Sequence, residues 1–139
     1  MAIAGINFDK ILVEKLKPIE APLKINSNLS LTDITKEKDT EKGSALLRFD
    51  FVFNLDYSPK QAVVEIKGHI FLRDKEKQVD DIISTWKKTK KVSPALAEQV
   101  VNVALLKSNI KALILSQEFG LPPHIKFPTV ASRPGNYHG

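Results

Sequence analysis

The sequence contains no cysteine, and this absence removes several kinds of chemistry at once. Disulfide frameworks, zinc sites with thiolate ligands and cysteine nucleophiles are all excluded. Long apolar runs are missing too, because no stretch reaches the roughly 18 to 20 residues that a membrane-spanning helix needs. Residues 1–8 lack a basic cluster ahead of an apolar run, so we expect no signal peptide. These absences predict a cytoplasmic protein with no membrane partner.

Positive charge is in modest excess, with 21 Lys and Arg against 16 Asp and Glu in 139 residues. Residues 1–44 hold seven Lys and seven acidic residues, so the whole excess belongs to residues 45–139. Such a balance permits non-specific nucleic-acid binding but is a weak indication of it. The length suits one domain. We predict a single domain over residues 1–130 and a flexible tail over residues 131–139.

Strict apolar alternation marks the middle of the chain. It predicts two strands, Leu46–Asp56 and Ala62–Leu72, and the short turn with Pro59 between them predicts an antiparallel hairpin. Two earlier strands are expected at Leu23–Thr32 and at Phe8–Leu16. The apolar residues of Phe8–Leu16 do not keep one parity, which indicates a bulge or a partly helical segment. Residues 36–43 alternate in charge and predict a mobile hairpin loop.

Helical spacing takes over after the hairpin. A short amphipathic helix is predicted from about Lys75 to Lys88. Ser93 as N-cap begins a long helix, Pro94–Gln117, which ends before Gly120. The apolar stripe of this helix is wider than one sheet face requires, so we expect it to contact a second layer or another subunit. The prediction is an α+β fold: a four-stranded antiparallel sheet covered by a long C-terminal helix and a shorter preceding helix.

The sequence contains no phosphate-binding glycine loop, no HExxH or GxSxG motif and no EF-hand spacing. His69, His124 and His138 have no partner at ligand spacing, and His69 is interpreted as solvated or paired across strands. Asp80 and Asp81 are neighbours on a helix, where side chains point about 100° apart, so they are interpreted as a charged helix start. We therefore predict no catalytic residue, no metal site and no cofactor, and a protein that is not an enzyme.

Trp86 stands among four lysines at positions 87, 88, 90 and 91. An aromatic ring amid lysines can stack on a base while the amines contact phosphates. The interpretation we favour places Trp86 in the core and the lysines in water at a helix end. A basic nucleic-acid-binding or protein-interaction module without catalysis remains the alternative function.

The order of predicted elements resembles that of the bacterial export chaperone SecB family. The resemblance runs from Ile6 to Val130 and rests on the proline-bearing crossover at Ala21-Pro22, the strands and the two helices. It also rests on the glycine, prolines and apolar residues after the long helix. These are Gly120, Pro122 or Pro123, Ile125, Phe127 and Pro128.

Membership would imply an ATP-independent holdase that binds unfolded polypeptide clients through apolar grooves as a homo-oligomer, a dimer or a tetramer. The crossover and the segment after the long helix are both stiffened by proline and both carry apolar side chains, so they are candidates to line such a groove. The candidate client-binding residues are Pro18, Ile19, Pro22, Leu121, Pro122, Ile125 and Phe127. The alternative is that Ile19, Leu121 and Ile125 simply close the ends of the core.

Overall fold

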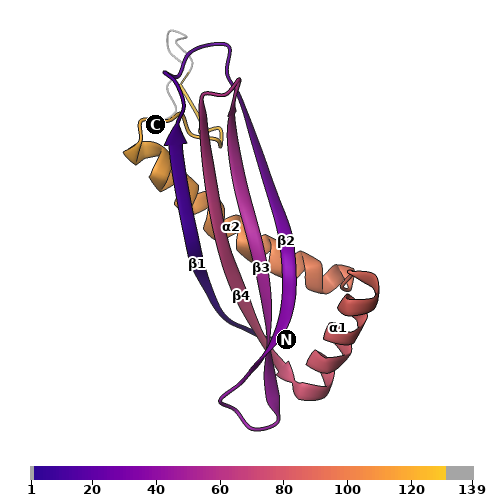
Figure 1. Cartoon of the computed structure of the whole chain (residues 1–139). Helices are drawn as coiled ribbons and strands as arrows, with labels where there is room; N and C mark the ends of the chain where they lie inside the picture. The colour runs from indigo at the N-terminus through magenta and orange to yellow at the C-terminus, as the bar shows by residue number, and fades with distance from the viewer. Residues whose placement is uncertain (1, 131–139) are drawn as a thin grey trace.

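The computed structural model describes residues 2–130 and shows one antiparallel sheet with two helices on the same face (Figure 1). The strands stand in the order β1-β4-β3-β2. The elements are β1 (Ala2–Lys15), β2 (Lys24–Lys38), β3 (Ser44–Ser58), β4 (Ala62–Lys75), α1 (Glu76–Thr89) and α2 (Pro94–Glu118). This arrangement confirms the predicted α+β fold. The predicted tail, with His138, lies outside the described residues.

The edge strands are longer than the sequence suggested. β1 begins at Ala2 rather than Phe8, and β2 runs to Lys38 rather than Thr32, because each continues to pair with its neighbour. The prediction of a mobile loop over residues 36–43 is therefore wrong in its first part. The side chain of Asp39 is only 1% exposed, and Arg73 on β4 donates to its carboxylate. That guanidinium holds the pKa of the Asp39 carboxyl below its usual value.

Bulges explain the mixed parity of β1. Its register with β4 shifts between Phe8 and Lys10, so Asp9 has no partner directly opposite it. The extra residue brings Phe8 and Ile11 to the same face of the sheet. Of the two readings of this segment, the bulge is confirmed.

The core lies between the sheet and the helices. Alternate residues of β3 are fully or almost fully buried along its whole length: Ala45, Leu47, Phe49, Phe51, Phe53, Leu55 and Tyr57. At one end of the sheet they pack with Val79 of α1 and Val100 of α2. At the other end they pack with Ala112 and Leu115 of α2. The single apolar face that the alternation predicted is thus covered by both helices.

Local signals set the two ends of α2. The Ser93 hydroxyl accepts a hydrogen bond from the Leu96 N–H at 3.3 Å, and Pro94 stands in the first turn. Gly120 has φ +65°, a conformation that favours glycine, and reverses the chain after the helix. The chain then returns toward the sheet, which places the residues after α2 beside it.

Candidate functional site

The crossover between β1 and β2 is fixed by Gln61, a residue that the sequence did not single out. The Gln61 side chain accepts from the Glu20 N–H at 2.8 Å and donates to the Glu20 carbonyl at 3.0 Å. Its backbone carbonyl accepts from Leu16 at 2.8 Å and from Lys17 at 3.3 Å. Gln61 is 1% exposed. The only sequence signal was its place beside the Pro59 turn, and these three partners in the crossover are more than forty residues away.

We call these hydrogen bonds the Gln61 clamp. They fix the position of the crossover, which carries three of the candidate client-binding residues. Ile19 is half-buried and packs against the core cluster that contains Leu121, whereas Pro18 and Pro22 are exposed. The structure therefore brings Ile19 and Leu121 to the same end of the sheet, as the groove hypothesis requires. It also supports the simpler reading for these two side chains, because both help to fill the core.

The segment after α2 is attached by several polar contacts. The Leu121 N–H donates to the Ser116 carbonyl at 2.8 Å, and the Leu121 side chain is buried. The Tyr57 hydroxyl donates to the Pro122 carbonyl at 2.7 Å and lies 3.2 Å from the Ser116 hydroxyl. Burial raises the pKa of Tyr57. The segment is thus held against the sheet at its beginning.

His124 attaches the same segment to α2. Its Nε2 lies 2.7 Å from the Asn109 Oδ1, and its ring meets the Phe53 ring edge-on. Burial lowers the pKa of the His124 imidazole, and the buried Nδ1 has no hydrogen-bond partner within the described residues. A neutral imidazole that donates from Nε2 satisfies this arrangement.

A hollow of about 330 Å³ opens between α2 and the segment after it, and we call it the C-terminal hollow. Its lining is Leu113, Ile114, Ser116, Gln117, Leu121, Pro123 and Phe127. Two of the predicted client-binding residues, Leu121 and Phe127, meet here. Ile125 is exposed outside this lining, and the crossover residues do not line it.

The outer face of α2 extends this apolar surface. Three large side chains point away from the sheet, with exposed fractions of 60% for Leu106, 49% for Ile110 and 46% for Ile114. We call these three residues the outer stripe. In the middle of the helix, the side chains that face the sheet are small: Ala104, Ser108 and Ala112. The helix is thus apolar on two faces, one of which has no partner within the described residues.

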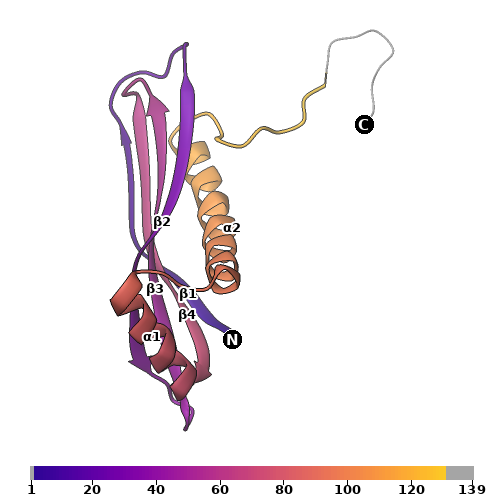
Figure 2. The ribbon, with the colours of Figure 1, turned by 90° about the vertical axis from the view of Figure 1, so that its right-hand side faces the viewer.

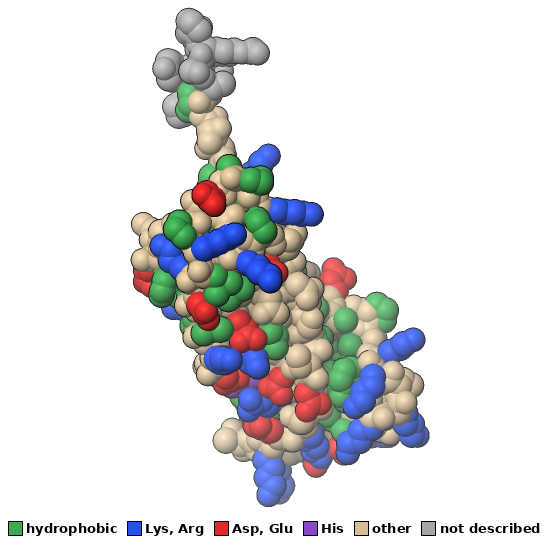
Figure 3. Space-filling model, turned by 45° about the horizontal axis from the view of Figure 1, so that its top comes forward, with side chains coloured by type: hydrophobic (Ala, Val, Ile, Leu, Met, Phe, Trp, Pro, Cys, Tyr) green, Lys and Arg blue, Asp and Glu red, His purple; other side chains and the backbone are tan. Residues whose placement is uncertain are grey.

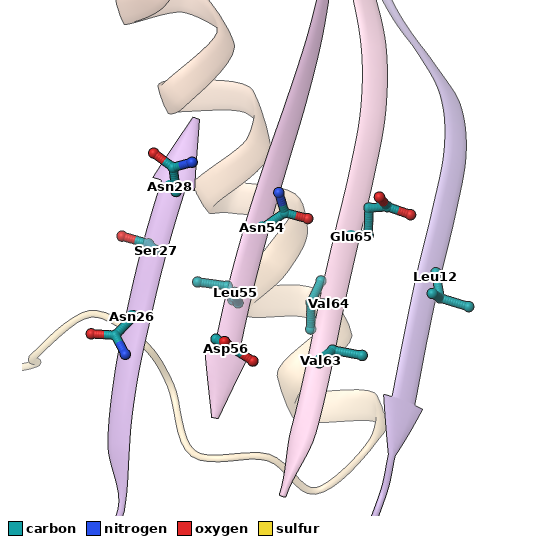
Figure 4. Close-up of a pocket in the computed structure, with 10 residues that line it drawn as sticks. All are labelled: Leu12, Asn26, Ser27, Asn28, Asn54, Leu55, Asp56, Val63, Val64 and Glu65. Carbon is teal, nitrogen blue, oxygen red and sulfur yellow. The ribbon is translucent and has the colours of Figure 1, made fainter. Parts of the chain in front are cut away.

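The face of the sheet opposite the helices is polar. A shallow hollow of about 460 Å³ lies there near one end of the strands, with Asn28, Asn54 and Glu65 in one row across the sheet (Figure 4). Nearer the middle, the His69 Nδ1 lies 2.8 Å from the Asp9 carboxylate, so His69 is paired across strands as expected. No group of side chains that could hold a metal ion occurs among residues 2–130. Nor does the described part of the chain hold a helix long and apolar enough to span a membrane.

Fold and surface together define an α+β domain with a helix-backed antiparallel sheet and an apolar surface around α2. No family model matches the chain, and no curated protein matches it. Among solved structures, the chain is similar to the Mycobacterium tuberculosis Rv1957 SecB-like chaperone, in complex with a ChAD peptide from the Rv1956 HigA1 antitoxin. The match covers 96% of this chain and 91% of that chain, with 13% identity and a TM-score of 0.49.

Proposed function

We propose that this protein is a non-catalytic, ATP-independent, chaperone-like binder of unfolded or extended apolar polypeptide, related to the SecB family. The observation that carries the proposal is the apolar lining of the C-terminal hollow. Monomeric soluble proteins rarely leave large apolar patches in water unless those patches bind something. The proposal places the protein in the cytoplasm, as a homo-oligomer.

The form of this surface suits a variable partner. The C-terminal hollow is open, and its polar side chains are only Ser116 and Gln117. Such a lining offers apolar contact but few fixed polar contacts that would select one sequence. Binding there should depend on apolar burial, so it should show a negative heat-capacity change and survive moderate salt. Phosphate contacts, by contrast, weaken steeply as salt rises.

The test compares an apolar with a basic variant in suppressing aggregation of an unrelated denatured protein. Ile114 and Phe127 both line the C-terminal hollow and are exposed, so the double change Ile114→Ser and Phe127→Ser leaves the core intact. Each lost contact removes about 1–2 kcal/mol of apolar burial, so client affinity should fall about tenfold or more. Ile19→Ser and Leu121→Ser are poorer choices because both side chains help to fill the core.

The matched control changes the four lysines at positions 87, 88, 90 and 91 to glutamine. Under the proposal this variant keeps full activity at moderate salt. If the lysine variant loses binding while the apolar variant keeps it, the proposal falls and the basic nucleic-acid-binding module takes its place. Purified protein with an absorbance excess at 260 nm would point the same way.

A further inference from the structure

Four lysines stand together where α1 ends, at positions 87, 88, 90 and 91, and we call them the lysine patch. All four are exposed, and none forms an ion pair in the part of the chain that the structure describes. Lys87 and Lys88 suit the dipole at the end of α1, but Lys90 and Lys91 lie beyond the helix. Helix stability therefore does not account for the whole lysine patch.

The acidic side chains of α1 do little to offset this charge. Lys36 of β2 lies 2.9 Å from the Glu76 carboxylate and 2.8 Å from the Asp80 carboxylate, so these two are already paired. Residues 84–97, which surround the lysine patch, contain no acidic residue. The patch is therefore a local excess of positive charge (Figure 3), which attracts and orients a partner of the opposite sign.

The turn that carries the lysine patch has a defined shape. The Lys90 N–H donates to the Trp86 carbonyl at 2.8 Å, and the Lys91 N–H donates to the Thr89 hydroxyl at 3.2 Å. Lys90 has φ 56°, and its ammonium lies 5.3 Å from the centre of the Trp86 ring. A turn that is ordered before binding loses less conformational entropy when a partner arrives.

A hollow of about 220 Å³ opens beside the lysine patch, between α1 and the start of α2, and we call it the interhelix hollow. Its apolar lining comes from Ile82, Val92 and Leu96. Lys91 of the patch and Asp81 of α1 also line it, and both are exposed. Ligand pockets commonly measure about 300–1,000 Å³, so this hollow suits one side chain of a peptide better than a whole small molecule.

The surroundings favour a polypeptide over a nucleic acid as the partner. The Trp86 ring packs against the core and Lys90 stands over it, so the ring is not open for stacking on a base. Carboxylates flank the patch in the sequence, at Asp81 on α1 and at Glu98 on α2. They would repel a long phosphate backbone, whereas a short acidic segment needs only the patch. An apolar side chain of such a segment would fill the interhelix hollow.

We propose that the lysine patch and the interhelix hollow bind an acidic segment of a partner protein, with one apolar side chain of that segment in the hollow. This inference goes beyond the proposed function, because the site is separate from the C-terminal hollow. The two hollows lie at opposite ends of α2, whose 25 residues span about 37 Å. In Figure 2, α1 lies beside the lower half of the sheet, whereas the segment after α2 leaves from the top.

The test measures the binding of labelled, end-blocked peptides of about nine residues to the full chain by fluorescence anisotropy. The first peptide has one central leucine with glutamates on both sides. It should bind, and its affinity should fall several-fold as salt rises from about 50 to about 300 mM, because exposed charges are screened. A second peptide, with glutamine in place of every glutamate, should bind about tenfold or more weakly. A third, with serine in place of the leucine, should bind about fivefold or more weakly.

Protein variants then locate the site. Changing the four lysines of the lysine patch to glutamine should weaken binding of the first peptide about tenfold or more. The matched control removes the same charge from four exposed lysines at the end of the sheet beside the crossover, and it should bind within about twofold of the parent. Its changes to glutamine are at Lys15, Lys17, Lys24 and Lys60. Asp81→Asn removes the carboxylate at the interhelix hollow and should tighten binding several-fold.

Failure of the first peptide to bind the parent protein overturns the inference. So does an equal loss in the control variant, which would show that net charge alone attracts the peptide. Equal binding of the leucine and serine peptides would show that the interhelix hollow takes no part, which also overturns it. A labelled oligouridylate of about twenty nucleotides is the rival ligand, and the inference falls if this binds the lysine patch more tightly than the first peptide. Aggregation suppression by the same variants reports on the proposed function separately, so the two proposals fail independently.

Discussion

At the scale of single residues, Phe51 and Gly68 show how tightly the centre of the sheet is built. They stand opposite each other on β3 and β4. A Cβ atom on Gly68 would lie 2.5 Å from the Asn7 carbonyl oxygen and 2.7 Å from Phe51 Cζ. Both distances are shorter than real contacts, so only glycine fits here. The Phe51 ring fills the space that a side chain on Gly68 would occupy, so the buried apolar face of the sheet has no gap at Gly68.

His124 is the residue whose charge should matter most for the segment after α2. Burial lowers the pKa of its imidazole from the ordinary value of 6.5, so the unfolded chain binds a proton more readily than the folded one. Stability is therefore retained above about pH 6.5 and falls as the pH drops below it. Urea unfolding at pH 7.5 and at pH 5.5 should show a smaller loss of stability for His124→Gln than for the parent.

The matched control for this measurement is His138→Gln, which removes a histidine outside the described residues. It should keep the pH dependence of the parent. A His124→Gln variant with the same loss of stability as the parent would show that His124 is not the responsible group. The hydrogen bond between His124 Nε2 and Asn109 Oδ1 would then persist when the imidazole is protonated.

At the scale of elements, the crossover depends on the β3–β4 turn through Gln61. Gln61→Ala would remove the two hydrogen bonds between its buried amide and the Glu20 backbone, which costs about 1–3 kcal/mol. Urea unfolding should show this loss, and amide exchange should show faster opening at Glu20. Lys60→Asn in the same turn, where φ is 46°, should stay within about 0.5 kcal/mol of the parent. Equal stability of Gln61→Ala and the parent would contradict the clamp.

The elements differ in how well sequence alone predicts them. The β3 alternation and the Ser93-Pro94 start of α2 are local signals, so both were predicted. The orientation of α2 was predicted only in its first half, because Leu96 and Val100 of the apolar stripe face the sheet while Ile110 and Ile114 further along the stripe are exposed. The structure instead packs the small residues Ala104 and Ala112 on the sheet. At Ala104 and Ala112, the short distance between α2 and the sheet leaves room only for small side chains. Side-chain size, more than hydrophobicity, therefore decides which residues face the sheet there.

The candidate site was also predicted only in part, because local sequence signals set some of its residues and long-range contacts set the others. Proline and glycine fixed the chain reversal that brings Leu121 and Phe127 to the C-terminal hollow. Contacts between residues far apart in the chain decided the rest. The Gln61 clamp joins residues 41 positions apart, and the pairing of His69 with Asp9 spans 60 positions. No periodic pattern reports such pairs.

At the scale of the whole molecule, the end that carries α1 is rich in basic side chains. Figure 3 shows Lys and Arg side chains gathered at the lower right, where α1 lies. Trp86, beside these lysines, packs partly into the core, and the Lys90 ammonium lies 5.3 Å from its ring centre. Its Nε1 is buried as well. This placement agrees with the core interpretation of Trp86 and leaves little of the ring for base stacking.

The last prediction concerns self-association through α2. The outer stripe is a contiguous apolar strip on one helix, and pairing it with its copy about a two-fold axis would remove it from water. Light scattering at micromolar concentration should therefore give a mass of at least twice 15.5 kDa. The double change Leu106→Gln and Ile110→Gln should shift the protein toward the monomer, because each loses about 1.5 kcal/mol or more of burial per copy.

Asn102→Gln is the matched control, since it alters an exposed polar side chain of the same helix and should leave the mass unchanged. Circular dichroism should show the same helix content for all three proteins, because the altered residues do not face the sheet. A parent protein with the mass of one chain would contradict self-association. The outer stripe would then be open to client polypeptide at all times, and the double variant should lose aggregation suppression without any change in mass.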